Sequence, residues 1–236
     1  MTVQNPYAAP QAAYSPPGPG AVQSAYGHDY VPLRWRTVMA GIAIGFVVLL
    51  GFGMHVAQLF FQPALTGGVR TGTPDLMAAA VIGLTAIAFL GASVCAWVLV
   101  PVWMHRASSN LRGLGRYGMT FSPGGCAGWF FVPFANLVMP PRAMSEMWRA
   151  SDPEADQGSW FASKGTPLVA VWWAAWLVAG VISWGAYFAK DSPDVATTIG
   201  LISNTLSAVA GVMLIALMRG VSGRQQQAAA RLGGVR

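Results

Sequence analysis

Long uncharged stretches alternate with short charged segments along this chain. Four stretches contain no Asp, Glu, Lys or Arg, and they cover about residues 38–61, 76–104, 167–189 and 195–218. Each exceeds the roughly 20 residues that an α-helix needs to cross about 30 Å of hydrocarbon. Because backbone polar groups in lipid need partners within the protein, each stretch is expected to be helical. The pattern predicts an all-α membrane protein with four transmembrane helices, in a domain over residues 33–219.

The composition supports a membrane location. Hydrophobic residues make up 54% of the 236 residues and charged residues only 9%, whereas soluble domains carry about 25% charged residues. So little charge cannot cover the surface of a soluble domain. The first apolar stretch begins too late and runs too long for a cleavable signal peptide, so we expect it to remain as the first span.

The basic residues predict how the spans are oriented. With the N-terminus inside, 12 of the 14 Lys and Arg residues fall on the inner side, and only Arg70 and Lys190 fall outside. Because Lys and Arg accumulate in cytoplasmic segments, both termini are expected in the cytoplasm. The net charge of +6 then reflects topology and attraction of the inner arginines to anionic lipid headgroups. The arginines accompany no nucleic-acid-binding motif, so no nucleic-acid partner is expected.

Two terminal segments flank the predicted transmembrane domain. Residues 1–32 are rich in Pro, Tyr and Ala, and such a segment buries too little apolar surface to offset the entropy of ordering. We expect a disordered cytoplasmic tail, which acts either as a plain tether or as a docking site for a protein partner. Residues 220–236 are expected to form a basic cytoplasmic tail.

The segment between the second and third stretches, residues 105–165, is expected in the cytoplasm. Its apolar core, residues 126–139, is too short to span comfortably and contains Pro133, which removes one backbone donor from a helix. A further crossing would also place the C-terminal arginines outside, against the charge rule. The pattern therefore predicts a re-entrant or interfacial helical segment, followed by an amphipathic helix that starts at a proline pair.

Polar residues in this region are the candidate functional residues. Arg106 and Asn110 share one helical face at i, i+4 spacing, and Glu146 and Arg149 share another at i, i+3 spacing. We expect Glu146 to pair with neighbouring arginines, and Asn136 to satisfy backbone groups that the proline break exposes. These five residues either form a buried polar clasp that fixes the segment or line a site for a passing solute.

Aromatic and proline residues of the same region are expected to be motif and packing positions. Trp103 lies at the end of the second span, where tryptophan is typical of the membrane–water interface. The other members of this set are Trp129, Pro133, Pro140 and Trp148.

The spans themselves contain few polar groups. Glycines such as Gly45 in the first span and Gly211 in the fourth predict close helix packing, with a glycine-lined permeation path as the alternative. His55 and His105 are expected at opposite ends of their spans, too far apart to share a metal or haem. The two cysteines match no metal-binding spacing, so neither a metal nor a cofactor is predicted.

Several spaced motifs resemble a known family. They are W-x-x-R-A-x-x-N-L from Trp103 to Leu111, S-P-G from Ser122 to Gly124, W-F-x-x-P-x-A-N-L-x-x-P from Trp129 to Pro140, and M-x-E-x-W-R-A-S from Met144 to Ser151. In these motifs, and in flanking spans over roughly residues 35–218, the chain resembles the bacterial family called domain of unknown function 4328. The resemblance implies a multi-pass protein of the bacterial cytoplasmic membrane, and it implies no particular activity, substrate or cofactor.

Three classes of function are compatible with these features. The favoured interpretation is a membrane interaction or scaffold protein that uses its cytoplasmic segment and Pro-rich tail. The alternative is a small oligomeric transporter or channel with a polar site at the broken helix, since irregular backbone lines many transport sites. An enzyme acting on lipid would need a convergent acid–base or metal set. Because Glu146 is the one acidic group near the apolar core, we predict no enzyme activity.

Overall fold

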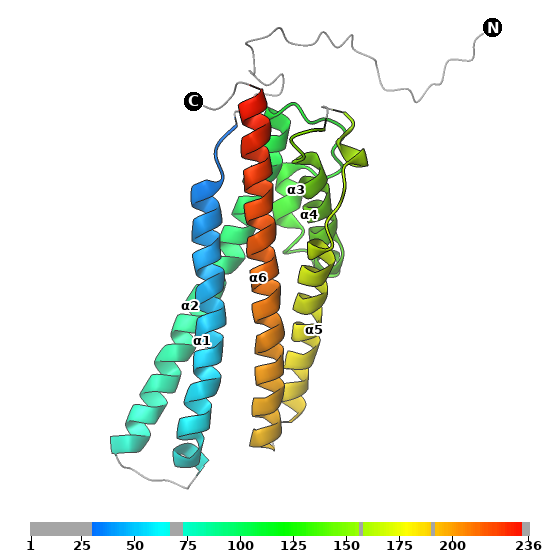
Figure 1. Ribbon diagram of the computed structural model, residues 1–236. Coiled ribbons are helices and arrows are strands. Elements are labelled where there is room, and N and C mark those ends of the chain that lie inside the picture. The colour runs from blue at the N-terminus through cyan, green and yellow to red at the C-terminus, as the bar shows by residue number, and fades with distance from the viewer. Residues whose placement is uncertain (1–29, 67–72, 156–157, 190–191, 233–236) are drawn as a thin grey trace, which may run out of the picture.

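The computed structural model describes residues 30–66, 73–155, 158–189 and 192–232, and every regular element in these ranges is a helix (Figure 1). In chain order the elements are α1 (Arg34–Thr66), α2 (Thr73–Gly113), α3 (Pro123–Gly128), η1 (Ala135–Leu137), α4 (Met139–Ala150), η2 (Trp160–Ala162), α5 (Leu168–Phe188) and α6 (Pro193–Arg231). The two η elements are short 3-10 helices. The predicted all-α class is confirmed, and residues 1–29 of the predicted tail lie outside the described residues.

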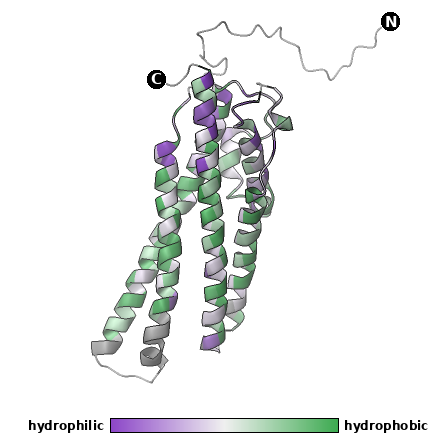
Figure 2. Ribbon diagram, in the orientation of Figure 1, coloured by the Kyte–Doolittle hydropathy of each residue, from purple (hydrophilic) through white to green (hydrophobic). Residues whose placement is uncertain are grey.

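Four of these helices are long and apolar enough to cross a membrane. They contain the candidate spans Arg34–Ala57, Leu76–Gly113, Leu168–Gly185 and Asp194–Arg231. Figure 2 shows their long hydrophobic middle, with hydrophilic residues gathered mainly where the chain enters α1 and leaves α6. Large apolar side chains on α2, such as Leu84 and Ile87, are 68% and 69% exposed, an arrangement that lipid stabilises and water does not. The chain is therefore an integral membrane protein.

The four long helices follow one another in the order α2, α1, α6, α5 (Figure 1). α1 packs along α2, α5 packs along α6, and α1 also contacts α6. No comparable contact joins α2 to α5 among the described residues. The shorter helices gather at one end of the bundle, and we call residues 103–165 together with residues 217–231 of α6 the cap.

Both α2 and α6 continue beyond the predicted spans and into the cap. The residues predicted as a basic tail are helical through Arg231. Positions 221, 225, 228 and 229 are buried, and this spacing places them on one face of a helix. Ala228 and Ala229 pack against Leu114 and Tyr30. This part of the chain is rich in Gln, Ala and Arg, which are good helix formers, and it stays helical because the cap buries one of its faces.

Small residues set the spacing between α1 and α6. A Cβ at Gly211 would lie 2.9 Å from Cγ2 of Ile44, and a Cβ at Gly51 would lie 2.5 Å from Oδ1 of Asn204. Both glycines therefore allow an approach that a larger side chain would prevent. A Cβ at Gly45, in contrast, would meet no atom within 4 Å. The predicted close packing is confirmed at Gly211, whereas Gly45 faces open space.

The predicted re-entrant segment consists of the short helix α3, a loop and η1. Ser122 caps the start of α3 with its side chain. In the loop, the rings of Phe131 and Trp97 of α2 have centroids 6.2 Å apart. The Leu137 carbonyl accepts a hydrogen bond from Nε1 of Trp173 of α5 at 2.8 Å. The segment therefore lies between α2 and α5, and its entry into the bilayer stays a prediction.

The packing at Gly211 generates a direct test. We expect Gly211→Leu to lower the unfolding free energy of the detergent-solubilised protein by about 1–3 kcal/mol, because the added Cβ would lie only 2.9 Å from Cγ2 of Ile44 and would force that side chain or the helix to shift. Gly45→Leu is the matched control, since it adds the same side chain in open space and should change the unfolding free energy by less than about 0.5 kcal/mol. Denaturant unfolding of both variants measures the difference, and equal effects would contradict the α1–α6 contact.

Candidate functional site

A fully buried amide on α2 joins the start of the described chain to the cap. The side chain of Asn110 accepts a hydrogen bond from the Val31 N–H at 3.1 Å and donates one to the Val31 carbonyl at 2.8 Å. Asn110 is 0% exposed. The amide pairs with both backbone groups of Val31, as a neighbouring strand would, and so holds the chain where it enters α1.

Gln225 of α6 completes this arrangement. Its Oε1 accepts a hydrogen bond from Nδ2 of Asn110 at 3.2 Å. Its Nε2 donates to the Ala107 carbonyl at 3.0 Å and to Oγ of Ser151 at 3.2 Å. Ser151 donates in turn to the Met147 carbonyl at 2.6 Å, and both Ser151 and Gln225 are 0% exposed. We call the side chains of Asn110, Ser151 and Gln225, together with the backbone of Val31, the clasp.

The clasp is satisfied by the protein itself. The Asn110 and Gln225 amides each donate two hydrogen bonds and accept one. A buried polar network in which every donor is paired specifies one arrangement, whereas removal of one member leaves its partners unpaired at about 1–3 kcal/mol per group. The clasp therefore fixes α2, α6, the end of α4 and the segment before α1 relative to one another.

Side chains on either side of Val31 are packed into the cap as well. Leu33 is buried in the main core. Tyr30 packs against Leu114 and the end of α6, and burial raises the pKa of its hydroxyl above the usual value. Residues 30–32, which the sequence assigned to the tail, therefore belong to the folded domain.

Glu146 and Arg112 hold the loop between α2 and α3. The carboxylate oxygens of Glu146 accept hydrogen bonds from the N–H groups of Thr120 and Phe121 at 2.8 and 3.1 Å. Arg112 donates to the Phe121 carbonyl at 3.0 Å and to Oγ of Ser108 on its own helix at 3.0 Å. The Glu146 carboxylate is thus occupied by backbone N–H groups, rather than by the neighbouring arginines that the sequence suggested.

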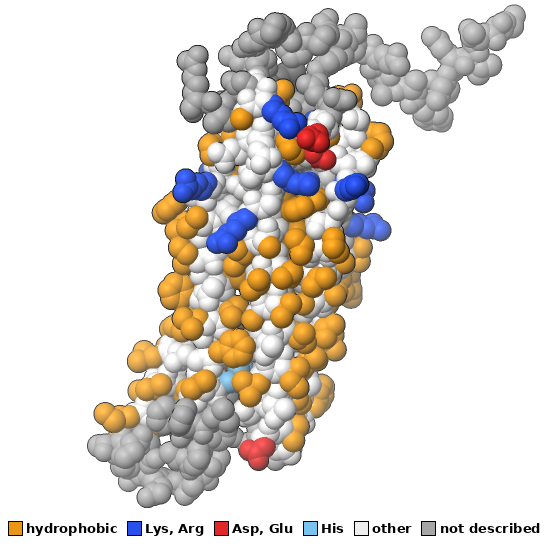
Figure 3. Space-filling view, in the orientation of Figure 1, with side chains coloured by type: hydrophobic (Ala, Val, Ile, Leu, Met, Phe, Trp, Pro, Cys, Tyr) orange, Lys and Arg blue, Asp and Glu red, His pale blue; other side chains and the backbone are white. Residues whose placement is uncertain are grey.

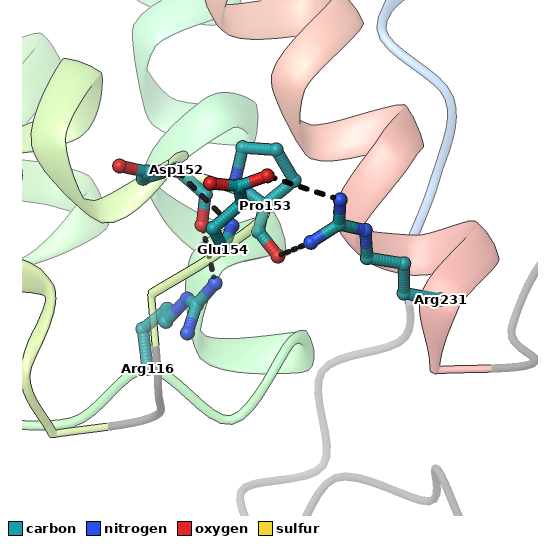
Figure 4. A network of polar contacts seen from close by, with 5 residues as sticks. All are labelled: Arg116, Asp152, Pro153, Glu154 and Arg231. Atoms are coloured by element: carbon teal, nitrogen blue, oxygen red, sulfur yellow. Dashed lines mark hydrogen bonds and ion pairs between the residues drawn. The ribbon is translucent and has the colours of Figure 1, made fainter.

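Arg116 binds the chain at the end of α4. Its Nε donates to the Ala150 carbonyl at 3.1 Å. Its Nη2 donates to the Asp152 carbonyl at 2.8 Å, as Figure 4 shows. A third bond runs from Nη1 to the Ala155 carbonyl. A cation at a helix C-terminus stabilises the unpaired carbonyls there, and Arg116 is only 6% exposed. The arginine therefore fixes the turn that follows α4.

An exposed set of contacts lies beside Arg116. Arg231 donates to the Pro153 carbonyl at 3.0 Å and pairs with Glu154 at 3.4 Å (Figure 4). The Arg231 and Glu154 side chains are 57% and 78% exposed, so this ion pair contributes little to stability. Partial burial works to raise the pKa of Asp152, but hydrogen bonds from the Glu154 N–H and Ser163, with nearby arginines, hold that pKa below its usual value.

Of the five polar residues predicted for the site, only Asn110 belongs to the clasp. Arg106 is half-buried one turn earlier on α2, and Glu146 holds the loop described above. Asn136 is half-buried in η1, apart from the clasp, and Arg149 is exposed. The structure thus contains a buried polar clasp, but its members bond to backbone groups and to α6 rather than to the other predicted residues.

Trp103, which the sequence predicted at the membrane–water interface, is buried in the protein core, and its depth in the bilayer stays a prediction. It is 0% exposed, and its Nε1 donates a hydrogen bond to Oγ1 of Thr37 in α1 at 2.9 Å. It lies seven residues, about two helical turns, before Asn110 on α2, within the main core. Trp103 is therefore a core residue that joins α1 to α2 about two helical turns from the clasp.

The remaining predicted packing residues differ in burial. The ring of Trp148 lies 4.3 Å from the guanidinium carbon of Arg224 on α6, an arrangement typical of a cation–π contact. Pro140 is buried in the first turn of α4. Trp129 is half-buried at the end of α3, and Pro133 is exposed in the loop.

Sequence reasoning missed Gln225, Ser151 and Arg116. Gln225 was missed because the fourth apolar stretch ends at Met218. The spacing of buried positions 221, 225, 228 and 229 was the available signal, since it places Gln225 within an apolar helical face. Ser151 and Arg116 bond to segments distant in sequence, and no local pattern marks such contacts.

Comparison with known proteins adds one finding. The family model described as Domain of unknown function (DUF4328) matches residues 74–223, which include the motifs from Trp103 to Ser151. This match confirms the family resemblance and shows that its motifs build the cap. No curated protein and no solved structure matches the chain.

The clasp can be tested with two neighbouring glutamines. We expect Gln225→Leu to lower the unfolding free energy by at least about 2 kcal/mol, because Asn110 and Ser151 lose partners in a dry site. Gln226→Leu is the matched control, since Gln226 is exposed and its replacement should cost less than about 0.5 kcal/mol. Denaturant unfolding in detergent measures both. A Gln225→Leu variant as stable as Gln226→Leu would show that the clasp does not hold the cap.

Proposed function

We propose, from the premise that this chain belongs to the DUF4328 family, that it is a membrane interaction or scaffold protein of the bacterial cytoplasmic membrane. In this proposal the cap and both chain termini face the cytoplasm, and the N-terminal tail recruits a protein partner to the cap. The observation that carries the proposal is the clasp, because its bonds to Val31 fix the point at which the tail meets the membrane domain.

A fixed attachment point gives the tail a defined reach. A flexible chain of the length of residues 1–29 has a root-mean-square span of roughly 30 Å. A partner bound to such a tail is held close to the cap, which raises its local concentration there and favours further contacts. If residues 30–32 were not bonded to the cap, the attachment point would move, and the same partner would on average lie farther from the cap.

The chemistry of the tail indicates the kind of partner. Pro16, Pro17 and Pro19 favour an extended polyproline conformation, and tyrosines recur at positions 7, 14 and 26. Domains that bind such segments present an aromatic-lined groove to the preformed helix. The partner we propose is therefore a cytoplasmic protein with a groove of this kind.

Exposed cations support the orientation. Arg34, Arg142 and Arg219 are exposed at the cap end, and Figure 3 shows the Lys and Arg side chains of one face gathered in that part of the molecule. Asp194 lies at the opposite end. Cationic residues collect on the cytoplasmic side of membrane proteins, where they also attract anionic headgroups.

A small oligomeric transporter or channel is the alternative function, and it finds less support. Transport through a broken helix needs polar groups that are available to a solute. The Asn110 amide is fully engaged inside the clasp, and Asn136 lies apart from it in η1. The two residues therefore do not converge on one polar site.

The scaffold proposal is tested by crosslinking from the tail in native membranes. A photoreactive residue in place of Tyr14 should yield a crosslink to one cytoplasmic protein, and a soluble peptide of residues 1–29 should compete for it. Replacing Pro16, Pro17 and Pro19 together by Ala should weaken the crosslink several-fold at unchanged membrane abundance, because the preformed conformation is lost. An identical crosslink profile from a scrambled tail would contradict the proposal.

A further inference from the structure

A groove of about 510 Å³ lies between α1 and α6, where the two helices reach the cap. Residues of these two helices line it among the described parts of the chain, and no residue of the clasp does. Its volume falls within the range of about 300–1,000 Å³ that is usual for ligand sites. The groove is therefore a feature of the α1–α6 interface that the clasp does not explain.

Two glycines keep the groove open. A Cβ at Gly41 of α1 would meet Cγ1 of Ile215 at an ordinary contact distance of 3.9 Å, and a Cβ at Gly223 of α6 would meet no atom within 4 Å. Both glycines line the groove. Larger side chains at these positions would thus fit and would fill the space, in contrast to Gly211, where the two helices touch.

The two ends of the groove differ in polarity. One end is lined by apolar residues of the first and fourth uncharged stretches, namely Val38, Ile42 and Ile215. The other end is lined by hydrophilic residues that lie beyond those stretches, namely Arg34, Arg219, Ser222 and Gln226. Figure 3 shows basic side chains over the start of α1 and beside α6, at the level where the apolar surface of this face begins. The groove therefore crosses the boundary between the hydrocarbon layer and the headgroups.

The helix contacts place the two arginines at almost the same depth. α1 and α6 run in opposite directions (Figure 1), and Ile44 faces Gly211. Arg34 and Val221 each lie ten residues closer to the cap than this contact, so they are at one level, and Arg219 is two residues below it. At about 1.5 Å per residue, the two arginines differ in depth by about 3 Å.

Both arginines are available to a ligand. Arg34 and Arg219 are exposed, and neither guanidinium forms a hydrogen bond or ion pair with a described residue. Among the described residues, no Asp or Glu lines the groove. Guanidinium groups bind phosphate through paired, charge-assisted hydrogen bonds. Two of them at one level of one groove therefore favour a phosphate group as ligand.

The apolar end indicates that this phosphate belongs to a lipid. Val38 and Ile42 are 44% and 47% exposed, and a soluble phosphate compound would leave them uncovered. Lipid tails are as apolar as these side chains. An acyl chain therefore fills this end of the groove, and the headgroup of the same molecule lies at the arginines.

The lining also selects the type of headgroup. A zwitterionic headgroup carries an ammonium group beside its phosphate, and two guanidinium groups repel that ammonium. No acidic or aromatic residue lines the described groove to offset the repulsion. Ser222 and Gln226, in contrast, supply hydrogen-bonding groups that suit the hydroxyls of an anionic headgroup.

We propose that this groove binds one anionic glycerophospholipid, with its phosphate between Arg34 and Arg219 and an acyl chain along Val38 and Ile42. A single saturable site of this kind differs from the general attraction of surface arginines to headgroups. It goes beyond the scaffold function and does not depend on it. Because both leaflets contain lipid, it does not depend on which side of the membrane the cap faces either.

The test measures lipid binding to the full chain in detergent by native mass spectrometry, with dioleoylphosphatidylglycerol as the probe. One lipid should bind saturably. Arg34→Gln and Arg219→Gln should each raise its Kd about tenfold, because charge-assisted hydrogen bonds are lost. Arg142→Gln is the matched control. Arg142 is exposed at the cap end but does not line the groove, so the same loss of charge should change the Kd by less than about twofold.

A second pair of variants tests the shape of the groove with its charges intact. Gly41→Leu should weaken binding several-fold, because the added side chain occupies the space of the acyl chain. It should unfold within about 2 °C of the unaltered chain without lipid, since the Cβ has room. Gly45→Leu is the matched control, because Gly45 lies one turn away and does not line the groove, and it should bind lipid as the unaltered chain does.

Two further probes identify the source of the phosphate. Dioleoylphosphatidylcholine should bind at least about tenfold more weakly than the anionic lipid, because of its ammonium group. Glycerol 3-phosphate at millimolar concentration should not displace the bound lipid, because it has no acyl chain. Equal Kd values for Arg34→Gln and Arg142→Gln, unweakened binding by Gly41→Leu, equal affinity for the two lipids, or displacement by glycerol 3-phosphate would each overturn the proposal.

Discussion

Asn110 of α2 and Gln225 of α6 are both fully buried, and Nδ2 of Asn110 donates a hydrogen bond to Oε1 of Gln225. Because both groups are fully buried, a shift of one helix against the other would leave several donors unpaired. The constraint extends outward from this pair. Ser151 brings the end of α4 to the same point, and Val31 brings the chain before α1.

Polar side chains in the cap and in the membrane-spanning region differ in how far their hydrogen bonds are satisfied. In the cap, Asn110, Arg116 and Glu146 bond to backbone groups of other segments, so the family motifs around Asn110 and Glu146 hold a defined shape. In the membrane-spanning region, Nδ2 of Asn204 is buried without a hydrogen-bond partner among the described residues, and the amide packs against Gly51 of α1. A buried network in which every donor is paired stabilises one arrangement, whereas an unpaired buried donor lowers stability.

The sequence predicted the class of fold because a long uncharged stretch has one stable form in lipid. It also located Asn110, since a polar residue near a span end on a helical face is conspicuous. It did not predict Gln225 as the partner, because hydropathy ends the fourth span at Met218 although the helix continues to Arg231. It also did not predict that Trp103 is buried inside the protein, for a related reason. The hydropathy pattern shows where an apolar stretch ends. Which side chains are buried beyond that point depends on the packing of the cap, and the pattern does not show it.

A double-mutant cycle between Asn110 and Gln225 measures the central interaction most directly. The unfolding free energies of Asn110→Ala, Gln225→Ala and the double variant are determined in the same detergent. If the two amides act as one network, the double variant loses less than the sum of the single losses, with a coupling of at least about 1 kcal/mol. Losses that add to within about 0.3 kcal/mol would show that the two side chains act independently, and the clasp would not be the interaction that holds the cap together.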